Sequence, residues 1–213
     1  MIKKNLGKII ISSIIILLPI IAGVLLWDKL PEQIPTHFGP DGTPDQWGSK
    51  PFAVLFMPAF VLAMHWICVF ATTLDPKNKN ITDKTFKLVL WICPVLSILT
   101  SVITYLTALE YAVDIPLIMM LFTGALFVVI GNYLPKCRQN YTIGIKIPWT
   151  LNDEGNWNAT HRFAGVIWVT CGFVLIVTSW LKFAWIIFLC AVALMMIIPV
   201  VYSYLYYKNK KEP

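Results

Sequence analysis

The chain has 213 residues, of which 58% are hydrophobic and 13% are charged, and its formal net charge is +6. Soluble domains carry about 25% charged residues, so this composition, with a mean hydropathy of +0.71, excludes a soluble globular protein. The 5 cysteines form no CxxC pair and lie mostly in apolar stretches, which argues against a disulfide framework or a zinc site. The sequence therefore predicts a membrane protein without a large soluble domain.

Six apolar stretches are long enough for membrane-spanning helices, which need about 20 residues each. In chain order they cover residues 9–27, 52–73, 86–109, 115–134, 163–180 and 183–207. The first is longer than a signal-peptide core and lacks a cleavage site after it, so we expect it to be retained. Pro19 and Pro94 lie inside spans and are expected to kink them. The predicted fold class is an all-α membrane protein, a bundle of six transmembrane helices.

The basic residues predict the orientation, because cytoplasmic loops of membrane proteins are rich in Lys and Arg. With the N-terminus inside, only Lys29, Lys50 and Lys182 of the 17 basic residues fall outside. An even number of spans then returns the C-terminus to the cytoplasm. We interpret the positive charge as an orientation signal, with a secondary role at anionic lipid headgroups, and expect no direct binding of nucleic acid.

His65 is the one ionisable residue deep in a predicted span. Such residues are costly in a membrane and often mark proton or ion paths. Two interpretations stay open: a neutral histidine hydrogen-bonded to a neighbouring helix, and a proton-handling site. The spans carry no Asp or Glu near their middles, which argues against a proton- or sodium-coupled transporter.

The first polar segment, residues 28–51, is predicted to be an extracellular loop structured by proline and glycine. Its prolines forbid a long helix and predict a string of turns, with a short extended piece at 34–38. Asp41-Gly42 favours a tight turn and Asp45 a turn cap. His37, Asp41 and Asp45 have the spacing of a helix face, but the prolines and Gly42 break any such helix and the pattern of an EF-hand loop is missing, so we predict no metal and no cofactor. The candidate binding residues here are Pro35, His37, Phe38, Asp41, Asp45, Trp47 and Lys50.

The second polar segment, residues 131–162, is predicted to face the cytoplasm and is dense in prolines, amides, basic residues and tryptophans. A short helix is expected at 150–154, and Asn158 or Thr160 could cap the fifth span. Basic residues beside tryptophans favour either anchoring at lipid headgroups or a docking site for a ligand or protein. The candidate partner-binding residues are Asn132, Pro135, Arg138, Asn140, Lys146, Pro148, Trp149, Asp153, Trp157, His161 and Arg162.

Asp153, Glu154 and His161 invite an enzymatic interpretation, but one histidine and two carboxylates are too common to define a mechanism. The chain has no HExxH, no GxSxG elbow, no phosphate loop and no dinucleotide fingerprint. We therefore predict that the protein is not an enzyme. A membrane enzyme acting on lipid or peptide remains an alternative, and so does a small-molecule or peptide transporter with His65 on its pathway.

Both polar segments resemble a known family. The outer run from Leu30 to Phe38, with Trp47-Gly48-Ser49-Lys50, resembles a small bacterial membrane domain of unknown function. The inner segment resembles the SdpI family through Gly131-Asn132-Tyr133-Leu134-Pro135-Lys136, Arg138-Gln139-Asn140, Gly144-Ile145-Lys146, Pro148-Trp149-Thr150-Leu151, Trp157 and Thr160-His161-Arg162. The resemblance implies two domains, a two-span domain at 1–74 and a four-span SdpI-like domain at 75–213.

The resemblance also implies a multi-pass protein of the bacterial inner membrane. In this family, an immunity protein protects its cell from a secreted peptide toxin, and its toxin-occupied form recruits a cytoplasmic ArsR-type repressor to the membrane. The expected partners are thus the lipid bilayer, a peptide toxin and a cytoplasmic transcriptional repressor. The outer segment is a candidate for the toxin face, and the inner segment for the repressor face.

Overall fold

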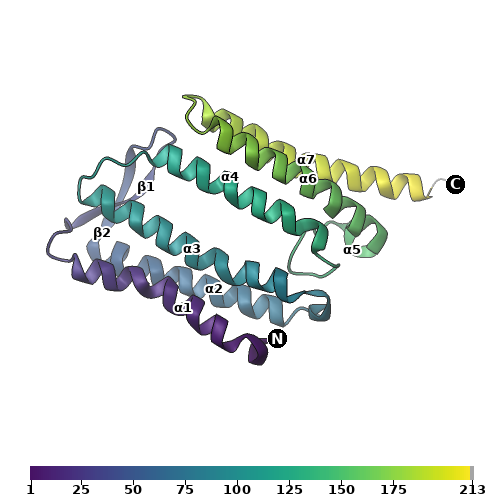
Figure 1. The fold of residues 1–213 in the computed structure, drawn as a ribbon, viewed down its shortest axis with the longest axis horizontal. Coiled ribbons are helices and arrows are strands. Elements are labelled where there is room, and N and C mark those ends of the chain that lie inside the picture. The colour runs from purple at the N-terminus through teal and green to yellow at the C-terminus, as the bar shows by residue number, and fades with distance from the viewer. Residues whose placement is uncertain (212–213) are drawn as a thin grey trace. The chain divides into compact units, whose positions relative to one another are not determined.

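A computed structural model describes residues 1–211 of the chain (Figure 1). Within this range, six helices are long and apolar enough to cross a membrane, which confirms the prediction of an all-α multi-span protein. They are α1 (Ile2–Leu25), α2 (Met57–Thr73), α3 (Asp83–Ala108), α4 (Ile115–Tyr133), α6 (Glu154–Thr178) and α7 (Ala184–Lys211). A π-helical turn, Phe52–Phe56, extends α2 at its start, immediately before Pro58, whose missing N–H interrupts α-helical pairing.

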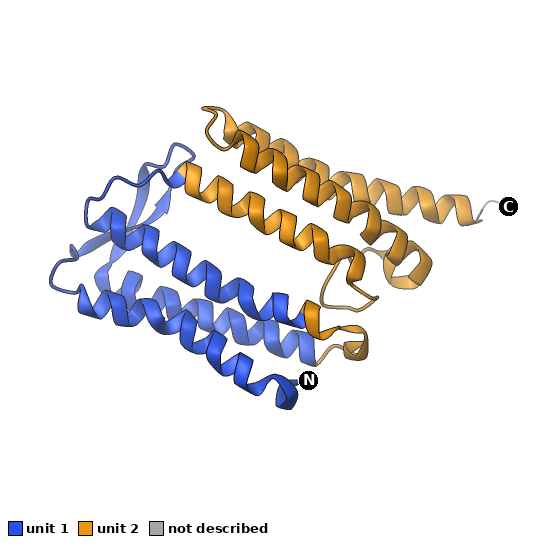
Figure 2. Ribbon diagram, viewed as in Figure 1, with its two compact units in different colours: residues 1–73, 86–115 blue, residues 74–85, 116–213 orange. Residues whose placement is uncertain are grey.

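The chain divides into two compact units, which Figure 2 colours separately. Unit 1 consists of residues 1–73 and 86–115, and unit 2 of residues 74–85 together with the chain from residue 116 onward. Most of α3 therefore groups with α1 and α2, a grouping that the sequence did not indicate. The short segment 74–85, which joins α2 to α3, belongs to unit 2.

The outer polar segment forms a β-hairpin: the extended piece expected at 34–38 is confirmed as β1, whereas the rest of the segment is a second strand and a turn where a string of turns was expected. β1 (Gln33–Phe38) pairs antiparallel with β2 (Pro44–Ser49), with register irregularities after Pro35. A two-stranded sheet has only edge strands, which tolerate proline. Gly42 lies in the turn with φ of 81°, a conformation that glycine adopts without steric cost. The predicted turn at Asp41-Gly42 is thus confirmed.

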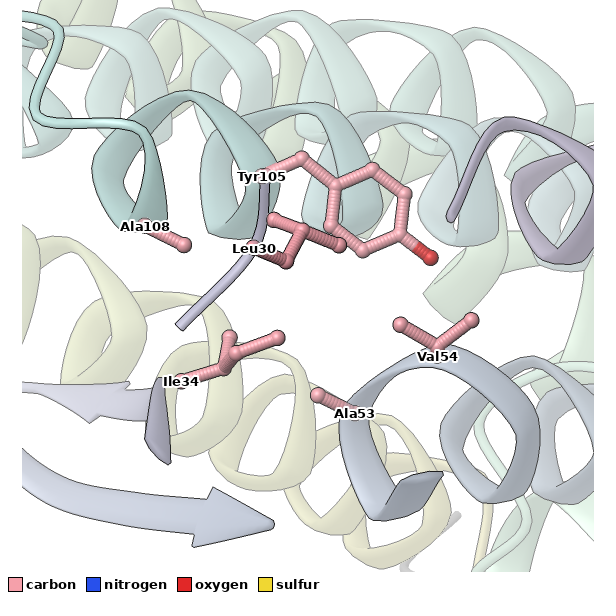
Figure 3. Packing of buried hydrophobic residues seen from close by; sticks show 6 residues of the cluster. All are labelled: Leu30, Ile34, Ala53, Val54, Tyr105 and Ala108. Atoms are coloured by element: carbon pink, nitrogen blue, oxygen red, sulfur yellow. The ribbon is translucent and has the colours of Figure 1, made fainter. Parts of the chain in front are cut away.

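An apolar cluster anchors the hairpin to unit 1 (Figure 3). Its members are all 9% exposed or less: Leu30, Ile34, Ala53, Val54, Tyr105 and Ala108. They come from β1 and the segment just before it, from the start of the second span and from α3. Burial of these side chains gives β1 a fixed place, since an isolated two-stranded hairpin is marginally stable in water.

His65 of α2 is fully buried, and its Nε2 lies 3.0 Å from the Oγ of Ser12 on α1. This contact fits the interpretation of a neutral histidine hydrogen-bonded to a neighbouring helix. The other ring nitrogen, Nδ1, is buried and has no hydrogen-bond partner within residues 1–211. The Ser12 contact is therefore the polar interaction on which the buried ring depends.

Ser12→Ala should lower the free energy of unfolding by about 1–3 kcal/mol, because it leaves the buried imidazole unpaired. Combining Ser12→Ala with His65→Leu should recover most of this loss, since two apolar groups need no hydrogen bond. Thermal unfolding of the purified protein in detergent measures both effects. A double variant whose loss equals the sum of the two single losses would show that these residues do not interact.

In unit 2, α4 and α6 approach each other at two pairs of glycines. A Cβ on Gly124 would lie 2.8 Å from the carbonyl oxygen of Gly172, and a Cβ on Gly131 would lie 2.9 Å from that of Gly165. The two glycines of each helix are about two turns apart and so share one face. Small residues allow membrane helices to pack backbone against backbone, and this contact holds α6 against α4.

The fifth span begins at Glu154, nine residues before the predicted start at 163. Asp153 is its cap, because its carboxylate accepts the backbone N–H groups of Gly155 and Asn156 at 2.8 and 3.2 Å. The expectation that Asn158 or Thr160 caps this helix is therefore wrong. The first turns of α6 are polar because Asn156, Thr160 and His161 point into unit 2, where they are buried.

Candidate functional site

The inner polar segment, which includes the start of α6, is hydrogen-bonded to the segment 74–85. The hydrogen bonds of this region define what we call the polar network, whose members all belong to unit 2: Asp75, Lys77, Asn80, Gln139, Asn140, Thr150, Trp157 and His161. Most of these side chains are buried. The network is therefore an ordered structure, unlike a solvated tether between spans.

Asp75 joins the two loops through its carboxylate. One oxygen accepts the backbone N–H of Lys77 at 2.7 Å. The other accepts the backbone N–H of Tyr141 at 2.8 Å and the hydroxyl of Thr142 at 2.6 Å. Asp75 is only 4% exposed, and a buried carboxylate needs such donors to offset its desolvation. It ties the loop after the second span to the loop after the fourth.

Gln139 completes this connection with its side-chain amide and its backbone carbonyl. Its carbonyl side-chain oxygen accepts the Lys77 ammonium at 2.6 Å, and its backbone carbonyl accepts the Asn80 amide at 2.7 Å. Its own amide donates to the backbone carbonyls of Thr150 and Leu151 at 2.8 and 3.0 Å. Gln139 thus links segment 74–85 to the short helix α5 (Pro148–Asn152). The short helix expected at 150–154 is therefore present but begins two residues earlier, and Asp153 and Glu154 belong to the start of α6.

His161 and Trp157 hold the middle of the inner segment against α6. The Nε2 of His161 accepts the backbone N–H of Ile145 at 2.9 Å, so its Nδ1 carries the proton and donates to the carbonyl of Trp157 at 2.8 Å. The Trp157 ring stacks on the imidazole with 4.0 Å between the ring centroids, and its Nε1 donates to the Cys137 carbonyl at 2.7 Å. Both rings are at most 1% exposed. The geometry selects a neutral imidazole held by backbone groups on both sides.

Gly144 lets the chain pass directly over these two rings. Its φ is 125°, and a Cβ there would meet Nε2 of His161 and the edge of the Trp157 ring. A side chain at this position would have both a strained backbone and no space. Glycine is therefore required at 144 by the packing of this loop.

Trp149 and Asp153 connect the inner segment to the end of α7. The Trp149 ring lies 5.2 Å from the ring of Tyr204 and 6.3 Å from that of Tyr207. Asp153 accepts the Lys210 ammonium at 2.6 Å. The hydrogen bond from Lys210 is the largest cause that holds the pKa of Asp153 below its usual range, and the backbone N–H groups at the start of α6 contribute less. The last turns of α7 are thus part of the same surface as α5.

Asp153→Ala should lower the free energy of unfolding by about 1 kcal/mol, which is typical for the loss of an N-cap. Asp153→Asn keeps a capping oxygen and should cost only a few tenths of that, since the partner Lys210 is largely exposed. Because the folded pKa of Asp153 is depressed, its contribution is present above the unfolded pKa and is lost as pH falls through the folded value. Thermal unfolding at neutral and acidic pH measures this. An Asp153→Asn variant with undiminished acid sensitivity would contradict the assignment.

The remaining inner candidates lie at the surface. Asn132, Pro135, Arg138, Lys146 and Arg162 are exposed, and so is Pro148, which occupies the first turn of α5. Asn132 accepts the Lys136 ammonium at 3.3 Å, and Arg162 donates to the Asn158 carbonyl at 3.4 Å. Asn140, by contrast, is 1% exposed and uses its amide to close the turn at residues 138–143. The structure therefore separates the inner candidates into buried supports and exposed side chains.

The outer candidates are gathered on the hairpin. His37 of β1 pairs with Asp45 of β2 at 2.6 Å, which replaces the expected turn-capping role of Asp45. Asp41 caps the turn, because it accepts the hydroxyl and the N–H of Thr43 at 2.7 and 3.0 Å. These bonds hold the pKa of Asp41 below its usual range. Trp47 is 55% exposed, whereas Pro35, its register partner on β1, is buried. Phe38, at the end of β1, is half-buried.

Lys50 is a buried support of the hairpin. Its ammonium donates to the Trp27 carbonyl at 3.1 Å, pairs with the Glu32 carboxylate at 3.0 Å and lies 5.4 Å from the centre of the Trp27 ring. Only 7% of its side chain is exposed. A charge in this position is stabilised by each of these contacts, and it joins the end of α1 to the base of the hairpin.

Sequence reasoning missed Asp75, Lys77, Asn80 and Gln139 as members of one site. Gln139 and Thr150 lie in the motif that resembles the family, but their residue types did not indicate that they connect two loops. Asp75 had one, since a carboxylate close behind an apolar span, in a segment rich in lysine, suggests a local partner. That partner is the backbone of residue 141, which no local pattern could identify.

Two family models match this chain, one over the outer hairpin and one over most of the inner polar segment. The model of the SdpI/YfhL protein family matches residues 136–203, and that of a domain of unknown function (DUF1648) matches residues 14–62. The chain is 32% identical over 213 residues to Immunity protein SdpI of Bacillus subtilis (strain 168), which covers 97% of each chain. No solved structure matches the chain.

Proposed function

Because the chain belongs to the SdpI/YfhL protein family, we propose that it is an immunity protein that protects a bacterial cell from a secreted antimicrobial peptide toxin. It is a multi-pass protein of the bacterial cell membrane. The observation that carries the proposal is the identity of 32% with Immunity protein SdpI along 97% of both chains. An alignment of this length includes the outer hairpin and the polar network alike.

The proposal extends to signalling. In it, the toxin-occupied protein sequesters a cytoplasmic ArsR-type repressor at the membrane. In the proposal, the hairpin, which follows one span, and the two loops of the polar network, which follow two and four spans, lie on opposite sides of a membrane. A receptor of this kind needs one face for each partner. Toxin binding would have to favour one conformation of the inner face for a signal to pass.

The hydrogen bonds of His65 and His161 support this proposal over a transporter or an enzyme. His65 is bonded to Ser12 through Nε2, and its Nδ1 has no hydrogen-bond partner within residues 1–211 that could continue a proton path. His161 has both ring nitrogens bonded to backbone groups, so neither is available as a general base without opening the loop. Each histidine therefore has a structural role that accounts for its presence.

The test is survival under toxin challenge. A Bacillus subtilis strain that lacks the gene for Immunity protein SdpI is transformed with this chain and exposed to the secreted peptide toxin against which that gene protects. We expect survival well above that of the empty-vector strain. Equal killing of both strains, at confirmed membrane abundance of the protein, would contradict the immunity proposal.

The signalling part has its own measurement, the membrane recruitment of a fluorescent ArsR-type repressor. Arg138→Ala should reduce recruitment while membrane abundance and thermal stability stay unchanged, because the Arg138 side chain is exposed. Lys182→Ala is the matched control, since Lys182 is an exposed basic residue between α6 and α7. Unchanged recruitment by the Arg138 variant would contradict a role for this residue in docking.

A further inference from the structure

The segment 74–85 lies outside both family matches, yet the structure makes it part of the inner site. Its three-residue 3-10 turn, Asn78–Asn80, places Asn80 against the backbone of Gln139. Lys79 precedes Asn80, and Arg138 precedes Gln139. The hydrogen bond of 2.7 Å between Asn80 and Gln139 therefore brings two exposed basic side chains, from loops about 60 residues apart, to one place.

An aromatic ring lies beside this basic pair. Tyr141 is 48% exposed, and the Lys77 ammonium lies 5.2 Å from the centre of its ring. The same ammonium donates to Gln139, so its position is set by two partners. The result is a surface with three cations and one exposed aromatic ring.

The acidic residues of the segment do not cancel this charge. Asp75 is buried, and its two oxygens are engaged by the backbone of Lys77, the backbone of Tyr141 and the hydroxyl of Thr142. Asp83 is exposed at the start of α3, beside the equally exposed Lys84. The surface next to the Asn80–Gln139 bond is thus positive.

From this juxtaposition we propose that Lys79, Arg138 and Tyr141 form a docking surface for the acidic face of a cytoplasmic protein. The inference rests on the proposed function, which requires a protein partner on this side, and it adds a loop that neither family match contains. Basic side chains that only anchor a protein at headgroups need no fixed geometry, because they reach the interface by their own flexibility. Here both loops are fastened to each other, and Arg and Tyr are typical of the residues on which protein interfaces depend.

The experiment uses the full-length protein in phosphatidylcholine nanodiscs and a fluorescent poly-glutamate peptide as the acidic probe. Lys79→Glu combined with Arg138→Glu should weaken binding about tenfold in fluorescence anisotropy, since like charges replace opposite ones. Tyr141→Ala should weaken it by a smaller factor. The control, Lys182→Glu combined with Lys208→Glu, changes the net charge equally at two exposed positions of unit 2 that are not members of this surface and should change binding less than about twofold.

Two results would overturn the proposal. Equal weakening by the control pair would mean that the peptide senses only net charge. Unchanged peptide binding by the Lys79 and Arg138 variant, with fewer phosphatidylglycerol molecules retained by the purified protein, would assign the surface to lipid headgroups. Failure of the wild-type chain to protect cells from toxin would instead contradict the proposed function, and it would leave the binding difference between the two variants intact.

Discussion

Gly172→Ala should lower the free energy of unfolding by about 1–3 kcal/mol, as expected when a methyl group is forced into a filled space. A Cβ at this position would lie 2.6 Å from the carbonyl oxygen of Gly124 and 2.8 Å from the backbone nitrogen of Val128. Both neighbours are backbone atoms, so no side-chain rotation can relieve the contact. α4 and α6 would have to separate. Thermal unfolding in detergent, with the yield of folded protein, measures the loss.

Gly7→Ala is the matched control, because a Cβ at Gly7 of α1 has nothing within 4 Å. In an open helical position, alanine is favoured over glycine by up to about 1 kcal/mol. The two substitutions are chemically identical, and we expect them to have opposite signs. A Gly172→Ala variant as stable as Gly7→Ala would show that the α4–α6 contact is looser than the structure has it.

Trp157→Ala should have the largest effect of any single substitution in the polar network, about 3–5 kcal/mol. The ring is 0% exposed, stacks on His161 and donates its Nε1–H to the Cys137 carbonyl. Its removal would leave a cavity under Gly144 and a buried carbonyl without its donor. We expect the inner segment to become sensitive to protease while the spans remain inserted, which limited proteolysis of membrane vesicles measures.

Two variants separate the contributions within this prediction. Trp157→Phe keeps most of the ring but lacks the N–H, so it should cost about 1–3 kcal/mol through the unpaired carbonyl. Trp180→Ala removes a ring that is 68% exposed, and its effect should stay within about 0.5 kcal/mol in detergent. Equal protease sensitivity of the Trp157 and Trp180 variants would contradict the role given to Trp157.

The sequence predicted the spans well and their ends less well. Hydropathy placed the fifth span at 163–180, whereas α6 begins at Glu154. The difference arises because the first turns of α6 point polar side chains into unit 2: the Asn156 amide donates to the Ser203 carbonyl at 2.8 Å, and the Ser203 hydroxyl donates back to Asn156 at 2.6 Å. A scale based on transfer to lipid counts such residues as loop, although their partners are within the protein.

The candidate residues show the same limit. Of the outer candidates, His37 and Asp45 were suspected of holding a ligand, and they are paired with each other across the hairpin. Of the inner candidates, Trp157 and His161 are buried supports, while Arg138 is exposed at the surface. Residue type and spacing indicated an ordered inner segment, but they could not say which side chains point inward.

By itself, the sequence determined that this protein crosses a membrane six times and that its candidate binding residues lie in two polar segments. Hydrophobic length and loop charge are properties of consecutive residues, so they can be read without a structure. Only the tertiary structure decided that segment 74–85 joins the inner segment, through Asp75 and Gln139. Such bonds connect residues far apart in the chain, so no pattern of consecutive residues indicates them.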